Sequence, residues 1–309
     1  MPNVPKGFSA GFAVPQVFPD GDVDVSMIRN VAQQAEAAGF TDLWTQEQLS
    51  GTSVSIDPLT LMSYLAAVTE RVGLGVSVLV LPVHSPLHLA KRLASLDVLS
   101  EGRLIAGVGL GGEWDTEALG IPEGRRLGRF MNVLEAVDAL WTQDRATVSG
   151  DFYSLSGTPM APKPVQQPRP PIWFGARVKT AVRRAARHGD GWMGPGSSNI
   201  ETFEKLVPAL RDELEKEGRD ASTFPISKRV YIAIDDDAQR ARLRLREWFA
   251  HNYGDEEMAE RVSVWGPAEH CFEYVDQLIA AGATHLLFNP VFDYEEHIEA
   301  LRPYLPAGG

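Results

Sequence analysis

Cysteine is nearly absent from this chain of 309 residues, in which Cys271 is the single example. One thiol cannot form an intramolecular disulfide, and chains without disulfides are typical of reducing, intracellular compartments. Long apolar runs are also missing, since the apolar stretch 72–83 is shorter than the roughly 20 residues that cross a bilayer. The first residues lack the basic and apolar segments of a secretion signal. We therefore expect a cytoplasmic protein with no membrane partner.

Positive charge is scarce as well. The net charge of −12 argues against nucleic acid as a partner, although a local basic pocket for a small anion is compatible with it. Apart from Lys228, no lysine lies inside an apolar strand, which disfavours a Schiff-base aldolase. Pro86 separates His84 from His88 and no third ligand is near in sequence, so no metal site is predicted. The expected partner is a small-molecule substrate.

Apolar, strand-like segments alternate with amphipathic, helix-like segments along the whole chain. A helix over 26–38, for example, is predicted from Ser26 as its N-cap and Gly39 as its stop. Eight βα units in a chain of this size favour the α/β class and a (β/α)8 TIM barrel over an open sheet. We predict one barrel domain over 1–309, with insertions at about 142–170 (a small hairpin and an extended arm) and 253–266. The eight predicted strands span residues 8–14, 40–45, 72–79, 104–108, 172–175, 191–193, 226–234 and 284–289.

The strand at 104–108 ends in a glycine-rich loop that runs to Gly112 and is followed by Glu113. Glycine permits a close approach of the backbone, and ligands of parallel α/β proteins bind at the carboxyl ends of strands. The segment therefore predicts a ligand, with tight packing of a helix against the strand end as the alternative. Residues 107–112 formally match G-x-G-x-x-G, but a long helix follows in place of a strand that ends in an acidic residue. We reject a Rossmann dinucleotide site on that ground.

Two further strand ends carry candidate binding residues. In the turn from Gly175 to Thr180, main-chain amides at a helix N-terminus would bind phosphate, assisted by Arg177, Lys179 and the Thr180 hydroxyl. A solvated connection is the alternative there. At the end of the strand 40–45, Trp44 is expected in the core, whereas Glu47 and Gln48 lie where polar groups meet a ligand or solvent.

Six segments, taken in order, resemble the bacterial luciferase-like superfamily of flavin and deazaflavin oxidoreductases. They cover nearly the whole chain, and the ordered set is more specific than any one of them. The segments are 35–44, 57–60, 69–75, 96–104, 107–109 and 187–192.

The resemblance implies a luciferase-like barrel whose mouth holds FMN or the deazaflavin coenzyme F420. In relatives a non-proline cis peptide supports the ring, and the matching bond here is Ser77–Val78. The resemblance also implies that Leu110 and Gly111 lie beside the ring and that Glu47 contacts it. It implies that residues 175–177 bind the phosphate. The predicted coenzyme-binding residues are Glu47, Ser77, Val78, Gly109, Leu110, Gly111, Gly175, Ala176, Arg177 and Thr180.

The sequence departs from the family pattern at Gln48, where many deazaflavin-dependent members have a catalytic histidine. An amide forms hydrogen bonds but does not exchange a proton near pH 7, so Gln48 is excluded as a general acid. Glu113 lies one residue beyond the position of an acidic residue in some members, because Gly112 occupies that position. His84, at the mouth of the third strand, is the remaining candidate proton donor. The candidate catalytic residues are Glu47, Gln48, His84 and Glu113.

Three functions follow from this resemblance. The first is an F420-dependent oxidoreductase that transfers hydride to or from a small organic substrate. We favour it because Ser77–Val78, followed by apolar residues 79–81, resembles the deazaflavin branch. The alternatives are a reduced-FMN-dependent two-component monooxygenase and a flavin-binding barrel without activity. The anionic coenzyme tail would meet Lys179 or the arginines within 125–129, the two insertions would form a lid, and relatives commonly form homodimers.

Overall fold

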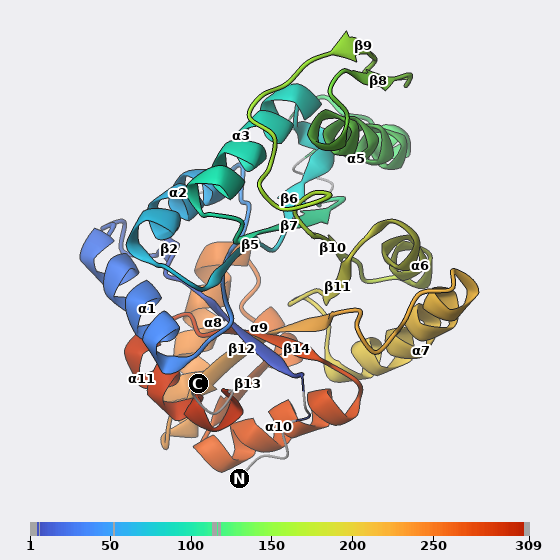
Figure 1. Ribbon diagram of the computed structural model, residues 1–309. Helices are drawn as coiled ribbons and strands as arrows, with labels where there is room; N and C mark the ends of the chain where they lie inside the picture. The colour runs from blue at the N-terminus through green and yellow to red at the C-terminus, as the bar shows by residue number, and fades with distance from the viewer. Residues whose placement is uncertain (1–4, 6, 52, 113–115, 117–118, 306–309) are drawn as a thin grey trace. The chain divides into compact units, whose positions relative to one another are not determined.

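The computed structural model describes residues 5, 7–51, 53–112, 116 and 119–305 (Figure 1). These residues belong to two compact units. Unit 1 comprises 1–44, 51–56 and 174–309, and unit 2 comprises 45–50 and 57–173. No helix among the described residues is long and apolar enough to cross a membrane. The prediction of a single domain stays a prediction.

The strands of the main sheet are hydrogen-bonded in the order β10-β11-β12-β14-β1-β3-β5-β7, and β10 also pairs with β7. This closed path contains the eight strands predicted from the sequence and is that of a (β/α)8 barrel. The bounds are β1 Ser9–Ala13, β3 Asp42–Thr45, β5 Gly73–Val76, β7 Leu104–Gly109, β10 Ile172–Gly175, β11 Gly191–Gly194, β12 Ile226–Ile234 and β14 His285–Asn289. Shorter strands are β2 Val17–Phe18, β4 Val54–Ser55, β6 Leu79–Val80, β8 Ala146–Val148, β9 Leu155–Thr158 and β13 Ser263–Gly266.

The helix predicted over 26–38 is present as α1 in unit 1. Its N-cap is Asp24 rather than Ser26, because the Asp24 carboxylate accepts a hydrogen bond from Met27 N at 2.9 Å. Gly39 ends this helix with a positive φ of 105°, as predicted. The helices are α1 Val25–Ala38, α6 Lys179–His188, α7 Ile200–Lys216, α8 Ala238–Tyr253, α9 Met258–Val262, α10 Ala268–Ala280, α11 Tyr294–Ala300 and the 3-10 helix η3 Arg302–Tyr304.

In unit 2 the predicted hairpin of the first insertion is formed by β8 and β9, which pair antiparallel and pack near α5 (Figure 1). The extended arm after it is anchored to α3 by the buried Asp97 carboxylate, which accepts hydrogen bonds from Val165 N at 2.8 Å and Gln166 N at 3.0 Å. The helices are α2 Pro58–Val68, α3 Pro86–Leu99, α5 Arg126–Thr142, and the 3-10 helices η1 Leu81–Val83 and η2 Glu123–Arg125.

A buried polar chain crosses the interior of unit 1. His285 Nε2 lies 2.9 Å from Asp42 Oδ1, and its Nδ1 lies 2.7 Å from Ser227 Oγ. Trp44 Nε1 also donates to Asp42, and Trp44 is buried as expected. Burial raises the pKa of Asp42, but the charge of His285 and hydrogen bonds to the carboxylate outweigh it, so the pKa is lowered overall. A methyl group at Gly11 would overlap the Asp42–Trp44 contact, which explains glycine there.

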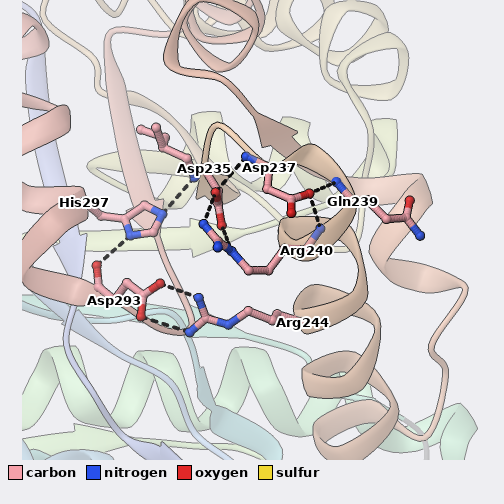
Figure 2. Close-up of polar contacts among 8 residues, drawn as sticks. Asp235, Asp237, Gln239, Arg240, Arg244, Asp293 and His297 are labelled. Carbon is pink, nitrogen blue, oxygen red and sulfur yellow. Dashed lines mark hydrogen bonds and ion pairs between the residues drawn. The ribbon is translucent and has the colours of Figure 1, made fainter.

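A second network joins the end of β12 to α8 and α11 (Figure 2). Arg240 forms two hydrogen bonds with Asp235, of 2.7 and 2.6 Å, and Arg244 pairs with Asp293. The buried His297 receives the Ile234 N–H at Nε2 and donates from Nδ1 to the Asp293 carbonyl, because a carbonyl only accepts. These contacts keep the imidazole of His297 neutral. Burial lowers its pKa, and neighbouring carboxylates offset only part of this effect.

The second predicted insertion contains α9 and β13. Its residues Met258 and Trp265 pack against a buried hydrophobic cluster of unit 1. The hydroxyl groups of Tyr253 and Tyr231 lie 2.6 Å apart. A role of this segment as a lid stays a prediction.

Candidate active site

Glu47 follows β3 in unit 2, and its carboxylate is buried, with 3% of the side chain exposed. It accepts a hydrogen bond from Val80 N at 2.6 Å and lies 3.0 Å from His84 Nε2. Val80 belongs to β6, and His84 follows the short helix η1 directly. The structure therefore brings together two of the four predicted catalytic residues, which are 37 positions apart in the sequence.

A carboxylate in contact with an imidazole is a common arrangement for holding or transferring a proton. The His84 side chain is 15% exposed, so it is accessible from outside the protein while Glu47 is not. The Val80 N–H occupies one Glu47 oxygen and fixes the orientation of the carboxylate. This geometry can orient the His84 imidazole.

Gln48 follows Glu47 directly and Thr45 precedes it by two residues, and both belong to unit 2. Gln48 Oε1 and Thr45 Oγ1 are buried and have no hydrogen-bond partner within the part of the chain that the structure describes. Buried polar atoms are nearly always hydrogen-bonded in proteins, to the chain, to water or to a ligand. The two atoms therefore fit a ligand that brings hydrogen-bond donors to the neighbourhood of Glu47.

The bond Ser77–Val78 is a non-proline cis peptide, as the resemblance predicted. Ser77 N donates to Thr45 O at 2.8 Å, which joins this bulge to the strand that leads to Glu47. The role of Ser77 and Val78 in coenzyme binding stays a prediction.

Gly109, the last residue of β7, and Gly111 beyond it approach the bulge around the Ser77–Val78 bond. A methyl group at Gly109 would lie closer than 3.0 Å to Val78 Cγ2, and one at Gly111 would similarly overlap Val80. Gly111 also has a positive φ of 75°, which favours glycine. Close packing thus accounts for both glycines, but the neighbours are Val78, between β5 and β6, and Val80 in β6 rather than a helix. Binding of a coenzyme by Gly109, Leu110 and Gly111 stays a prediction.

The predicted phosphate turn lies in unit 1. Ala176 N donates to Met193 O at 3.2 Å, so this amide is already used by the sheet. Helix α6 begins at Lys179, and its N-cap Val178 provides no side-chain hydrogen bond. Arg177 and Thr180 are exposed on the surface of the unit. The turn from Gly175 to Thr180 can offer these side chains and the amides of the first helical turn, and its role stays a prediction.

The arginines at the start of α5 have partners within unit 2. The Arg125 guanidinium lies 4.6 Å from the centre of the Phe152 ring, and Arg126 is 3.8 Å from Glu123. Arg129 donates to Pro82 O at 2.5 Å and to Tyr153 Oη at 2.6 Å. The partners come from η1, η2 and the β8–β9 hairpin. A role of the arginines in binding the coenzyme tail stays a prediction.

Lys228 is the buried lysine that the sequence singled out. Its ammonium donates to Pro195 O at 2.8 Å and Arg229 O at 2.9 Å. Burial, with the charge of Arg229, lowers its pKa to about 7.

Glu113 lies outside the described residues. Among the described residues, no group of three or more His, Cys, Asp or Glu side chains is arranged to hold a metal ion.

The comparison with known families assigns the chain. A family model described as luciferase-like monooxygenase matches residues 10–285. The chain belongs to this family. This luciferase-like protein is 30% identical over 285 residues to the F420-dependent glucose-6-phosphate dehydrogenase of Beutenbergia cavernae, covering 89% of this chain and 82% of the relative.

Two further similarities bear on the coenzyme and the fold. The FMNH2-dependent dimethylsulfone monooxygenase of Pseudomonas putida is 29% identical to this luciferase-like protein over 259 residues, covering 81% of this chain and 68% of the relative. An F420-dependent secondary alcohol dehydrogenase, solved in complex with an F420–acetone adduct, superposes with a TM-score of 0.81 at 17% identity. That match covers 97% of this chain and 98% of the other. The predicted luciferase-like TIM barrel is confirmed.

Proposed function

We propose that this protein is an F420-dependent oxidoreductase that transfers hydride to or from a small organic substrate. The observation that carries the proposal is the buried Glu47 carboxylate, which the Val80 amide and the His84 imidazole hold at the end of β3. The F420-dependent dehydrogenase among its relatives supports the choice of coenzyme. F420, when bound, supplies the hydride chemistry, and the protein supplies positioning and proton transfer.

The residues present in unit 2 fit such a coenzyme. Gln48 Oε1 and Thr45 Oγ1 are buried acceptors that a ligand with N–H or O–H donors would satisfy. Glu47 would orient the His84 imidazole, and His84 would hold or move the proton that accompanies hydride transfer. Gln48 would position a ligand by hydrogen bonds without taking part in proton transfer.

Reduced FMN, in a two-component monooxygenase, is the second candidate coenzyme. Gln48 favours it, because the catalytic histidine that many deazaflavin-dependent members have at this position is missing. The FMNH2-dependent relative, at 29% identity, supports the same alternative. Both candidates make the protein an oxidoreductase, and both use the Glu47 region.

The proposal also covers the phosphate site, the oligomeric state, the location and the substrate site of the protein. We propose that Arg177 and Thr180 bind the coenzyme phosphate and that the active form is a homodimer in the cytoplasm. The segments 142–170 and 253–266 would shape the substrate site. Glu113 stays a candidate catalytic residue from the sequence alone.

The deciding experiment is a fluorescence titration of the purified protein with F420 and with FMN in parallel. Tighter binding of F420 supports the first candidate, tighter binding of FMN the second, and binding of neither refutes both. Glu47→Gln should weaken binding of the preferred coenzyme, whereas Glu135→Gln, at an exposed position of α5, should not. Arg177→Glu should also weaken it if the phosphate turn is assigned correctly. Turnover is then measured with glucose 6-phosphate and propan-2-ol as hydride donors and acetone as an acceptor.

A further inference from the structure

The hairpin of the first insertion is attached to α5 by one buried amide. Asn132 Oδ1 accepts hydrogen bonds from Tyr153 N at 2.8 Å and Phe152 N at 3.2 Å, and its Nδ2 donates to Tyr153 O at 3.1 Å. A methyl group at Gly150 would overlap the Asn132 side chain, so the hairpin and the amide fit closely. Asn132 is 7% exposed. The position of Tyr153 is thus fixed through its own main chain.

From this position Tyr153 reaches the segment that carries His84. Its hydroxyl accepts from Arg129 Nη2 at 2.6 Å and lies 3.4 Å from His84 O. Arg129 also donates from Nε to Pro82 O at 2.5 Å, and its guanidinium lies 5.2 Å from the centre of the Tyr153 ring. Arg129 of α5 therefore holds Pro82 O by a short hydrogen bond, and Tyr153 of the hairpin reaches His84 O by a long one.

The charge of Arg129 determines the direction of these hydrogen bonds. A guanidinium stays protonated at any ordinary pH and only donates. The Tyr153 hydroxyl oxygen must therefore accept, and its own proton is left for the His84 carbonyl. The main chain of His84 is held in this way on one side, while the imidazole contacts Glu47 on the other.

We propose that Arg129 and Tyr153 are positioning residues that hold the His84 imidazole in contact with Glu47. Neither side chain contacts Glu47 or the imidazole in the described contacts, so both act through the main chain of η1 and His84. The effect of these residues on catalysis rests on the proposed function. Their effect on the geometry of the Glu47–His84 pair does not, because that geometry can be measured without a coenzyme. The insertion 142–170 then supports the active-site pair.

The first test observes His84 directly in the coenzyme-free protein. The histidine side chains are labelled with ¹⁵N, and the His84 signal is assigned from its loss in His84→Gln. Glu47→Gln gives the chemical shift of the His84 Nε2 resonance when the contact with the Glu47 carboxylate is absent. We expect Tyr153→Phe to move the Nε2 resonance more than half of the way to the Glu47→Gln position. Arg129→Ala should do the same, and Arg129→Lys, which keeps the charge and one donor, should restore part of the shift.

Ser154→Ala is the matched control, because it removes a hydroxyl from the same hairpin whose hydrogen bonds go to Gly150. It should leave the His84 resonance at the wild-type position. Tyr153→Phe retains the ring beside Arg129, so this variant is expected to fold, and thermal unfolding verifies it. The proposal is overturned if Tyr153→Phe and Arg129→Ala both leave the resonance in place while Glu47→Gln moves it.

The second test measures turnover with F420 and with the hydride donor or acceptor that the wild-type protein uses in the turnover assay described above. A positioning role predicts that Tyr153→Phe lowers kcat about tenfold and changes KM by less than about twofold, since a small misplacement of a catalytic group affects mainly the chemical step. Equal loss in Ser154→Ala would contradict the role. If neither F420 nor FMN binds, the proposed function fails, but the resonance of His84 still decides the positioning role.

Discussion

The methyl group added by Gly109→Ala gives the most direct test of how the glycine-rich strand end is used. This methyl would lie closer than 3.0 Å to Cγ2 of Val78, whereas carbon atoms in proteins normally approach to about 3.5–4.0 Å. The nearest other atoms of Val78 are Cβ at 3.3 Å and Cγ1 at 3.9 Å. Either the Val78 side chain must leave its rotamer, or β7 or the bulge must move.

The cost can be estimated from two opposing effects. Overpacking a filled site costs about 1–3 kcal/mol, and the severity of this overlap favours the upper end. Alanine in place of glycine recovers roughly 0.5–1 kcal/mol of backbone entropy within a strand. We therefore expect Gly109→Ala to lower the free energy of unfolding by about 2 kcal/mol.

Urea unfolding, followed by far-UV circular dichroism, measures this loss. Val78→Ala removes both Cγ atoms and leaves Cβ as the nearest neighbour, so the double variant should recover about 1–2 kcal/mol relative to additive effects. Gly124→Ala is the control, because no atom lies within 4 Å of the added methyl. An unchanged stability of Gly109→Ala, or the absence of rescue by Val78→Ala, would refute the packing explanation. If the double variant folds but no longer binds F420, while Val78→Ala alone still binds it, the coenzyme requires this glycine as well.

Three further predictions concern the buried polar networks of unit 1. Gly11→Ala should destabilise the protein by about 2–3 kcal/mol, since it forces apart a buried hydrogen bond to the Asp42 carboxylate. Because the pKa of Asp42 is lowered in the folded state, its stabilisation should be complete above pH about 4 and lost on further acidification. Asp42→Asn should remove this loss of stability at acid pH from unfolding curves. If the free energy of unfolding of the variant still falls at acid pH as in the wild type, other groups cause the loss. The lowered pKa of His297 means that the folded protein disfavours its protonation. Stability should therefore fall as the pH drops below about 6.5. His297→Gln should flatten the melting temperature between pH 7 and 5, and a slope equal to that of the wild type would contradict this.

The order of strands and helices could be predicted because each element carries its own local signal. Parallel strands buried on both faces are apolar throughout, and caps and glycines mark the ends of helices. The error at Ser26 shows the limit of such signals. Asp24 and Ser26 are both good capping residues, and Val25 between them is exposed, so the apolar pattern does not choose between them.

The candidate site was only partly accessible to the same reasoning. Glu47 and His84 were each predicted from their strand ends, but their contact depends on side-chain reach across neighbouring strands. Tyr153 was missed because its place depends on how a hairpin docks on a distant helix. One signal was available: Asn132 is a polar residue within the apolar part of α5, and a buried amide there requires main-chain partners from outside the helix.

The replacement of histidine by Gln48 and the contacts of His84 explain each other in this protein. The Gln48 amide can form hydrogen bonds as a histidine would, but it cannot exchange a proton near neutral pH. Of the predicted catalytic residues that the structure describes, Glu47 and His84 retain it, and imidazole is the group whose charge changes most readily near neutral pH. A histidine on a short turn is useful for this purpose only if the turn is held in place, because an imidazole displaced by an ångström loses its partner. The hydrogen bonds from Arg129 and Tyr153 to the carbonyls of residues 82 and 84 supply that support. Under the proposed function, His84 would therefore take the place of a histidine at position 48 in proton transfer, and Arg129 and Tyr153 would hold it there.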